Sequence, residues 1–280
     1  MSKVAVVTGG AGGMGLAAAH VLGRAAAVLI SDIDPGRLKA AERELGEAGV
    51  ACTATICDIT NRGSVAQLVE RAQSLGTVTS VVHAAGVSPS MGSAELIMKI
   101  NATGTILINQ AFLAIAHPGM GVVNVASVAG HQLPAFLAPV RRYKRSLTNP
   151  DRLHTELVKV CNLFPRARRP QLAYMLSKNF VIWYSRAMAA EFGTMGARVV
   201  SVSPGSFDTA MGKLEESVGA GALAQLGALK RFGHPSEIAE LLAFCASDKP
   251  GYLTGTDIIC DGGTMAAMTL TEALKLARPQ

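Results

Sequence analysis

The feature that most constrains the fold is a regular alternation of short apolar runs with longer amphipathic segments. Runs rich in Val, Ile, Leu and Ala predict strands, and apolar residues three or four apart predict the helices between them. Because helices separate the strands, the chain should form right-handed βαβ units. We therefore expect an α/β fold with one doubly wound parallel sheet flanked by helices, in a single domain over residues 1–280.

The expected strands and helices follow directly from this pattern. Strands are predicted at Val4–Thr8, Ala27–Ser31, Ala51–Ile56, Ser80–His83, Gly121–Ala126, Arg198–Val202 and Asp257–Cys260. Helices are predicted at Gly13–Leu22, Pro35–Ala48, Ser64–Leu75, Ala94–Ala116, Leu172–Phe192 and Ser236–Ala246, with a short one at Thr269–Arg278. The apolar share of 49% excludes a disordered chain, and no apolar stretch is long enough to span a bilayer.

A glycine-rich turn joins the first strand to the first helix. Its glycines match two spacings, Gly9, Gly13 and Gly15 or Gly10, Gly12 and Gly15. Glycines let the backbone approach a pyrophosphate, and the helix N-terminus attracts its negative charge. In this strand–turn–helix context the motif favours a Rossmann-type dinucleotide site over a merely flexible turn.

Two acids follow the next strands. Asp32 lies 17 residues beyond Gly15, close to the spacing of the acid that binds an adenosine ribose. A carboxylate there accepts bonds from both ribose hydroxyls and repels a 2′-phosphate, so it favours NAD over NADP. Arg37, the nearest cation, should face solvent. The alternative for Asp32 is an ordinary helix N-cap. Asp58 could contact the adenine or equally cap the helix that starts near Asn61.

Four polar residues suggest acid–base chemistry. Tyr174 and Lys178 are four apart on a predicted helix and therefore share a face. An ammonium beside a tyrosine lowers its pKa toward the range useful for proton transfer. Ser127 ends a strand at the sheet edge where ligands of α/β proteins bind, and Asn101 lies inside a predicted helix, where a buried amide needs partners.

Taken together, these motifs resemble the short-chain dehydrogenase/reductase family over about residues 3–264. The residues from Thr8 to Gly15 match its T-G-x-x-x-G-x-G loop, Asn101 its N-x-x-G asparagine, and Ser127 its serine. Tyr174 and Lys178 match its Y-x-x-x-K, and 204–209 match its P-G-x-x-x-T. The resemblance implies cofactor contacts at Gly9, Gly13, Met14, Gly15, Asp32, Asp58, Ala85, Gly86, Tyr174, Lys178, Pro204, Gly205, Phe207 and Thr209.

The resemblance also implies catalytic roles. Tyr174 would be the general acid/base, and Lys178 would lower its pKa and bind the nicotinamide ribose. Ser127 would hydrogen-bond the substrate oxygen, and Asn101 would hold a water in a proton relay to Lys178. One departure is His83, which stands where the family usually has Asn. We expect it to be a packed residue at the end of a strand rather than a second base.

A second departure is the distance between Ser127 and Tyr174, which 46 residues separate, far more than is usual in the family. We place a helical insertion at about 133–170, similar in position to one in some bacterial hydroxysteroid dehydrogenase/carbonyl reductases. Asn149-Pro150-Asp151 indicates a helix start there. Residues 131–170 carry nine Lys and Arg against two acids, a charge of +7 in a chain whose net charge is +6.

Three interpretations of this basic segment stay open. It could be a solvated cover over an apolar patch, a lid that attracts an anionic substrate, or a contact surface for a protein, nucleic acid or membrane. Nucleic acid is disfavoured because no known binding module accompanies the charge. Family members often form tetramers by packing the tyrosine-bearing helix against its copy. The insertion would disturb that contact, so we expect a homodimer or an unusual homotetramer.

The substrate should be small and lipophilic. The pocket is expected from segments that carry Met91, Leu133, Phe136, Leu137, Phe207, Met211 and Leu214, with residues 206–230 as a mobile lid. We expect an oxidoreductase that transfers a hydride between NAD(H) and a secondary alcohol or ketone such as a hydroxysteroid. The alternatives are a 3-hydroxyacyl-thioester dehydrogenase and a catalytically silent NAD-binding regulator. No metal site is predicted. Five cysteines without a paired spacing indicate a reduced, cytoplasmic protein.

Overall fold

Every predicted strand is present, and each pairs in parallel with its neighbours. The protein was analysed as a computed structural model that describes residues 2–215 and 221–268. The strands are β1 (Lys3–Thr8), β2 (Ala27–Asp32), β3 (Cys52–Ile56), β4 (Thr77–His83), β5 (Gly121–Val125), β6 (Arg198–Pro204) and β7 (Asp257–Cys260). They form one sheet in the order β3-β2-β1-β4-β5-β6-β7. The strand order reverses between β1 and β4, and α/β proteins bind ligands in the crevice at such a switch point.

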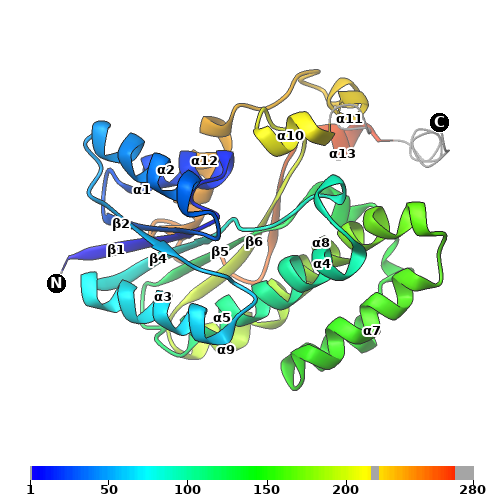
Figure 1. Cartoon of the computed structure of the whole chain (residues 1–280), viewed down its shortest axis with the longest axis horizontal. Coiled ribbons are helices and arrows are strands. Elements are labelled where there is room, and N and C mark those ends of the chain that lie inside the picture. The colour runs from blue at the N-terminus through cyan, green and yellow to red at the C-terminus, as the bar shows by residue number, and fades with distance from the viewer. Residues whose placement is uncertain (1, 216–220, 269–280) are drawn as a thin grey trace.

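Helices cover both faces of this sheet (Figure 1). One face carries α1 (Gly13–Leu22), α2 (Pro35–Glu47) and α12 (Pro235–Ala246). The other carries α3 (Arg62–Leu75), α4 (Ala94–Met98), α5 (Thr105–Leu113), α8 (Arg169–Ala187) and α9 (Ala189–Thr194). The short helices α10 (Ala210–Glu215), α11 (Gly221–Leu226) and α13 (Thr264–Ala267) gather at one end. This three-layer arrangement confirms the predicted α/β class.

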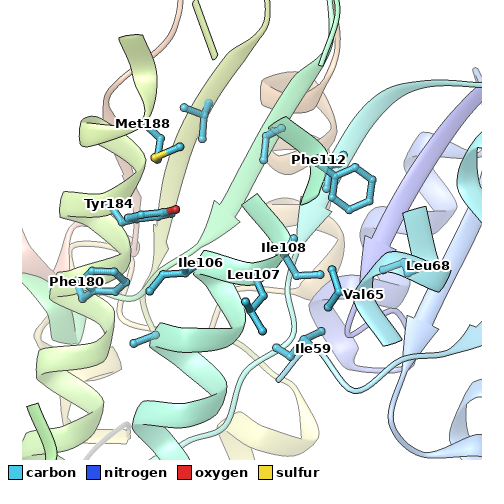
Figure 2. Packing of buried hydrophobic residues seen from close by; sticks show 14 of the residues in the cluster. Ile59, Val65, Leu68, Ile106, Leu107, Ile108, Phe112, Phe180, Tyr184 and Met188 are labelled. Atoms are coloured by element: carbon cyan, nitrogen blue, oxygen red, sulfur yellow. The ribbon is translucent and has the colours of Figure 1, made fainter. Parts of the chain in front are cut away.

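The largest of the three core clusters found among the described residues packs α3, α4, α5, α8 and α9 against one face of the sheet. Figure 2 shows side chains of α3, α5 and α8 meeting there, namely Val65, Leu68, Ile106, Leu107, Ile108, Phe112, Phe180 and Tyr184. Phe180 and Tyr184 stack with ring centroids 5.3 Å apart. Because α8 contributes its apolar face to this core, its position against the sheet is fixed by burial.

One predicted helix is in fact interrupted. The segment expected as a continuous helix over 94–116 consists of α4, a π-helical turn at Lys99–Gly104, and α5. A π-helical turn accommodates an extra residue, which changes the face that the following side chains present. Here it turns Asn101 inward, where only 2% of its surface is exposed. Helical periodicity alone does not reveal such a turn.

The segment 133–170 is helical, as expected, with α6 (Val140–Tyr143) and α7 (Pro150–Asn162) as its main elements. Asn149 caps α7 by accepting a hydrogen bond from the Arg152 amide at 3.0 Å. Leu153, Leu157 and Cys161 are fully buried, and α7 packs against α4 and α8 on the outside of the molecule (Figure 1). The basic segment therefore covers an apolar surface of α8.

Within residues 2–215 and 221–268, no helix combines the length and the apolar character that crossing a bilayer requires. The helix expected at Thr269–Arg278 and part of the lid expected at 206–230 lie outside the described residues.

Candidate active site

Three of the four predicted catalytic side chains converge at the end of β5. Tyr174 and Lys178 lie one turn apart near the start of α8, and the Lys178 ammonium is 5.8 Å from the centroid of the Tyr174 ring. Ser127 follows β5 and hydrogen-bonds the Tyr174 hydroxyl. The hydroxyl of a bound alcohol could therefore meet both oxygens at once.

The protonation of this cluster is set mainly by burial. Burial raises the pKa of Tyr174 above 10, the bond from Ser127 opposes that rise, and the negative charge of Glu215 adds to it. Burial also lowers the pKa of Lys178 to about 8. The Lys178 ammonium donates to the Val125 carbonyl at 2.9 Å. The expected lowering of the Tyr174 pKa by Lys178 is not found here, because burial raises that pKa by more than the bond from Ser127 lowers it.

Three hydrogen bonds fix the side chain of Asn101. Its Oδ1 accepts from the Val87 amide at 2.9 Å, and its Nδ2 donates to the Val87 carbonyl at 3.0 Å and to Ser177 at 3.2 Å. A Cβ on Gly86 would lie 3.2 Å from Asn101 Oδ1 and 3.5 Å from Lys178 Nζ. Asn101, Gly86 and Lys178 are thus close neighbours, and only a glycine leaves the space between them open.

His83 belongs to a buried polar chain that reaches both the cofactor turn and Asn101. Its Nδ1 lies 2.7 Å from Thr8 Oγ1, and its Nε2 lies 3.1 Å from Thr105 Oγ1. Thr105 Oγ1 donates its proton to the Asn101 carbonyl at 2.7 Å, so His83 must donate to Thr105 through Nε2. Nδ1 then accepts from Thr8. His83 is 2% exposed, and burial together with the charge of Lys178 lowers its pKa to about 3.

This depressed pKa predicts a loss of stability in acid. The unfolded chain binds a proton at His83 below about pH 6.5, whereas the folded chain binds it only near pH 3. His83 should therefore lower the free energy of unfolding by up to about 1.4 kcal/mol for each pH unit below 6.5. Urea unfolding at pH 7.5, 6.0 and 5.0 measures this slope, and His83→Asn should flatten it.

A matched control is His154→Asn on α7, a partly exposed histidine that hydrogen-bonds the Glu95 backbone carbonyl at 3.2 Å. It should leave the slope unchanged between pH 7.5 and 5.0. Equal slopes in the wild type and in His83→Asn would show that His83 is not the buried neutral group described above.

The glycine-rich turn is shaped so that side chains cannot enter it. A Cβ on Gly15 would overlap the carbonyl oxygen of Gly9, and a Cβ on Gly9 would lie 2.7 Å from the Ala85 backbone. A Cβ on Gly13 would lie 2.8 Å from the Thr209 side chain. The turn, the loop after β4 and the loop after β6 thus meet around one backbone cradle. Such a cradle suits a dinucleotide pyrophosphate.

The two acids predicted for the adenosine end have distinct surroundings. Asp34, not Asp32, caps α2, accepting from Gly36 N at 2.8 Å and Arg37 N at 3.0 Å. The alternative interpretation of Asp32 as the helix cap is therefore wrong. Arg37 is exposed, but it also donates to the Ala11 carbonyl of the glycine-rich turn at 3.2 Å, so it does not simply face solvent.

Asp58 does not cap α3. That cap is Asn61, whose side chain accepts from Ser64 N at 3.0 Å. Asp58 Oδ1 instead accepts from the amide and the hydroxyl of Thr60, both at 2.8 Å. The cap alternative is wrong, and the adenine contact stays a prediction.

The loop after β6 holds the remaining predicted contacts. Pro204 ends β6, and a Cβ on Gly205 would lie 2.7 Å from Asp261. Thr209 caps α10 by accepting from Gly212 N at 3.0 Å. Phe207 is only 5% exposed and packs in the core cluster that includes residues of α12, so its place in the substrate pocket stays a prediction. Met14 also packs against that core.

Other predicted pocket residues are exposed at the surface. Phe136 is 86% exposed, Leu137 58% and Leu214 56%. Some basic residues of the insertion form ion pairs with an acid of the same segment: Arg142, Arg145 and Arg152 all approach Glu156 of α7. Sequence reasoning missed Thr105, Ser177 and Glu215, which belong to none of the motifs and bond residues 22, 76 and 127 positions away.

Comparisons with known proteins agree with this geometry. The family pattern described as short chain dehydrogenase matches residues 3–139, and the pattern described as Enoyl-(Acyl carrier protein) reductase matches residues 165–265. Residues 140–164 match neither and contain most of the predicted insertion. The chain is 33% identical to the short-chain dehydrogenase/reductase bsc3 of Alternaria brassicicola, over 96% of this chain and 98% of that protein.

Two further similarities complete the comparison. The chain is 30% identical to D-threitol dehydrogenase of Mycolicibacterium smegmatis, over 93% of this chain and 92% of that protein. It superposes on an actinorhodin polyketide ketoreductase solved with NADPH at a TM-score of 0.73 and 22% identity, over 94% and 97% of the two chains. The chain belongs to the short-chain dehydrogenase/reductase family. It is accordingly an oxidoreductase of a family that uses nicotinamide cofactors.

Proposed function

We propose that this protein is an NAD-dependent dehydrogenase/reductase that interconverts a small lipophilic secondary alcohol and its ketone, with hydroxysteroids among the candidate substrates. The observation that carries the proposal is the convergence of Tyr174, Lys178 and Ser127 beside the glycine cradle. A hydroxyl acid/base next to a dinucleotide site is what reversible alcohol oxidation requires.

The chain's own residues would divide the work as follows. Ser127 would hydrogen-bond the substrate oxygen, and Tyr174 would take its proton during oxidation and return it during reduction. Lys178 and Asn101 would keep the nearby network oriented for proton exchange. The nicotinamide, when bound, supplies the hydride acceptor or donor. Gly9, Gly13 and Gly15 would hold its dinucleotide against the N-terminus of α1.

Asp32 supports NAD as the cofactor. It lies at the end of β2 and does not cap α2; its Oδ1 accepts from the Asp34 amide at 3.2 Å, and the remaining acceptor positions of the carboxylate suit the ribose hydroxyls. Arg37 is the cation that a 2′-phosphate would use, but its guanidinium already bonds the glycine-rich turn. Asp32 therefore favours NAD and Arg37 favours NADP, and replacing each residue in turn distinguishes the two effects.

The decisive experiment follows reduced-cofactor formation with NAD⁺ or NADP⁺ over a panel of secondary alcohols, hydroxysteroids and 3-hydroxyacyl-CoAs. We expect turnover of neutral lipophilic alcohols and higher kcat/KM with NAD⁺. Asp32→Ser should lower the NAD⁺ to NADP⁺ ratio of kcat/KM at least about tenfold, because two charge-assisted bonds are lost. Arg37→Ala should raise that ratio. A wild-type preference for NADP⁺ would overturn the role given to Asp32.

A 3-hydroxyacyl thioester is the second candidate substrate. The observation that favours it is the exposed cationic surface of the insertion, which includes Arg141, Arg142, Lys144 and Lys159. Highest kcat/KM on the hydroxyacyl-CoAs of the same panel would select this candidate. A silent regulator is disfavoured because all four predicted catalytic residues are present.

We also propose a homodimer or an unusual homotetramer in the cytoplasm. The support is that α7 packs on α8. In family members that pair through this helix, the partner subunit would need the surface of α8 that α7 occupies here. The five cysteines are all free, as expected in a reducing compartment. Light scattering over a dilution series tests the assembly, and an ordinary tetramer formed through the α8 face would contradict it.

A further inference from the structure

One acid that is not among the four predicted catalytic residues links the segment after β6 to the segment after β4. Glu215, at the end of α10, accepts a hydrogen bond from Ser88 Oγ at 2.6 Å and another from Ser90 N at 3.2 Å. Ser88 is only 1% exposed, so its buried hydroxyl is satisfied by a carboxylate from a different part of the chain. Bonds to an ionised acceptor are short and strong, which makes this contact a latch between the two segments.

The latch holds the Glu215 carboxylate against the loop after β4, where Val87, next to Ser88, bonds Asn101 of the candidate site. Burial has the largest effect on the pKa of Tyr174 and raises it. The bond from Ser127 lowers this pKa, and the charge of Glu215 raises it. The groups that bond Glu215 are a hydroxyl and a backbone amide, and neither carries a positive charge. The ammonium of Lys178, one turn along α8 from Tyr174, is directed to the Val125 carbonyl. A second carboxylate near Tyr174 would therefore meet Glu215 at low dielectric.

We propose that Glu215 is a specificity-determining residue that closes α10 over the active site and selects neutral alcohols and ketones against hydroxy acids. The acids disfavoured are those whose carboxylate lies two or three bonds from the reacting carbon. Longer anions place their charge beyond this region and are not excluded. The inference rests on the proposed function and narrows its substrate class.

The experiment compares 3-hydroxyoctanoate with its methyl ester, which replaces the charged carboxylate two bonds from the reacting carbon by a neutral group only one methyl larger. The wild type should prefer the ester. Glu215→Gln keeps an acceptor oxygen for Ser88 but removes the charge, so it should shift the ester-to-acid ratio of kcat/KM toward the acid by about tenfold. Ser88→Ala keeps the charge and removes one bond of the latch, so it should raise KM for both compounds and leave the ratio unchanged.

Glu47→Gln is the matched control, because Glu47 is an exposed acid of α2 that pairs only with Arg43. It should change neither KM nor the ratio. A ratio that moves by less than twofold in Glu215→Gln would overturn the selection. A purely structural role for Glu215 would alter KM in both variants alike and leave both ratios the same.

Hydrogen–deuterium exchange of residues 210–215 tests the latch without turnover. Ser88→Ala and Glu215→Ala should speed exchange there about tenfold, whereas Glu47→Gln should not. If the wild type oxidises neither compound, the proposed substrate class fails, and the exchange rates alone decide the latch. Unchanged exchange in both variants would overturn it.

Discussion

Replacing Tyr174 by phenylalanine should lower kcat for alcohol oxidation by about 10³-fold, because the substrate proton loses its acceptor. The ring itself should stay in place, since Tyr174 packs against the largest core cluster. Affinity for NAD⁺, measured by fluorescence titration, should change little. In the wild type, oxidation should also speed up as pH rises, because burial keeps the pKa of Tyr174 above 10 and its base form is scarce at neutral pH.

The same helix offers a matched control for this substitution. Among the residues that the structure describes, none hydrogen-bonds the buried hydroxyl of Tyr184, so Tyr184→Phe removes an equivalent atom away from the site. It should keep kcat near the wild-type value and should not destabilise the fold, because a buried unpaired hydroxyl is itself unfavourable. A Tyr174→Phe enzyme that kept more than about a tenth of wild-type kcat would contradict the acid/base role.

Gly15→Ala should have the largest effect on cofactor binding. The new Cβ would overlap the Gly9 carbonyl oxygen and lie 2.9 Å from the Gly9 carbonyl carbon, and neither backbone atom can rotate away. The turn must therefore move, which should cost about 3 kcal/mol or more of stability. Because the same backbone forms the proposed cradle, affinity for NAD⁺ should fall at least about 100-fold.

Gly46→Ala, in α2, provides the comparison. A Cβ at Gly46 meets no atom within 4 Å, so the change only improves helix propensity. It should raise the free energy of unfolding by about 0.5–1 kcal/mol and leave NAD⁺ affinity unchanged. Urea unfolding and fluorescence titration measure both variants. Normal NAD⁺ affinity in Gly15→Ala would show that the cofactor does not use this turn.

Much of the fold follows from patterns that are local in the sequence. The apolar run at β1, the glycine-rich turn and the helix after it are adjacent along the chain, so their order alone predicts a strand, a turn and a helix N-terminus. The same holds for Asn149, which caps α7 as expected. The π-helical turn at Lys99–Gly104 was not predictable, because its sequence is compatible with an ordinary helix.

Part of the candidate site could likewise be predicted from the sequence, and part could not. Tyr174 and Lys178 share a helix face because of their spacing, and sequence motifs also pointed to Ser127 and Asn101. The direction of the Tyr174 pKa shift depended on how deeply the ring is buried, which spacing does not report. The cap of α2 was assigned to Asp32 as an alternative, but Asp34 takes it because its side chain reaches the first free amides of that helix.

The sequence by itself determined the α/β class and the order of strands and helices, and it predicted the residues that a dinucleotide-dependent oxidoreductase would use. Only the tertiary structure decided which polar groups meet across the chain. Ser88 and Glu215 are 127 residues apart, and His83 joins Thr8 to Thr105 across two strands and a helix. Periodicity and motifs describe neighbours within a few residues, whereas such contacts arise when buried surfaces pack and their polar groups must find partners.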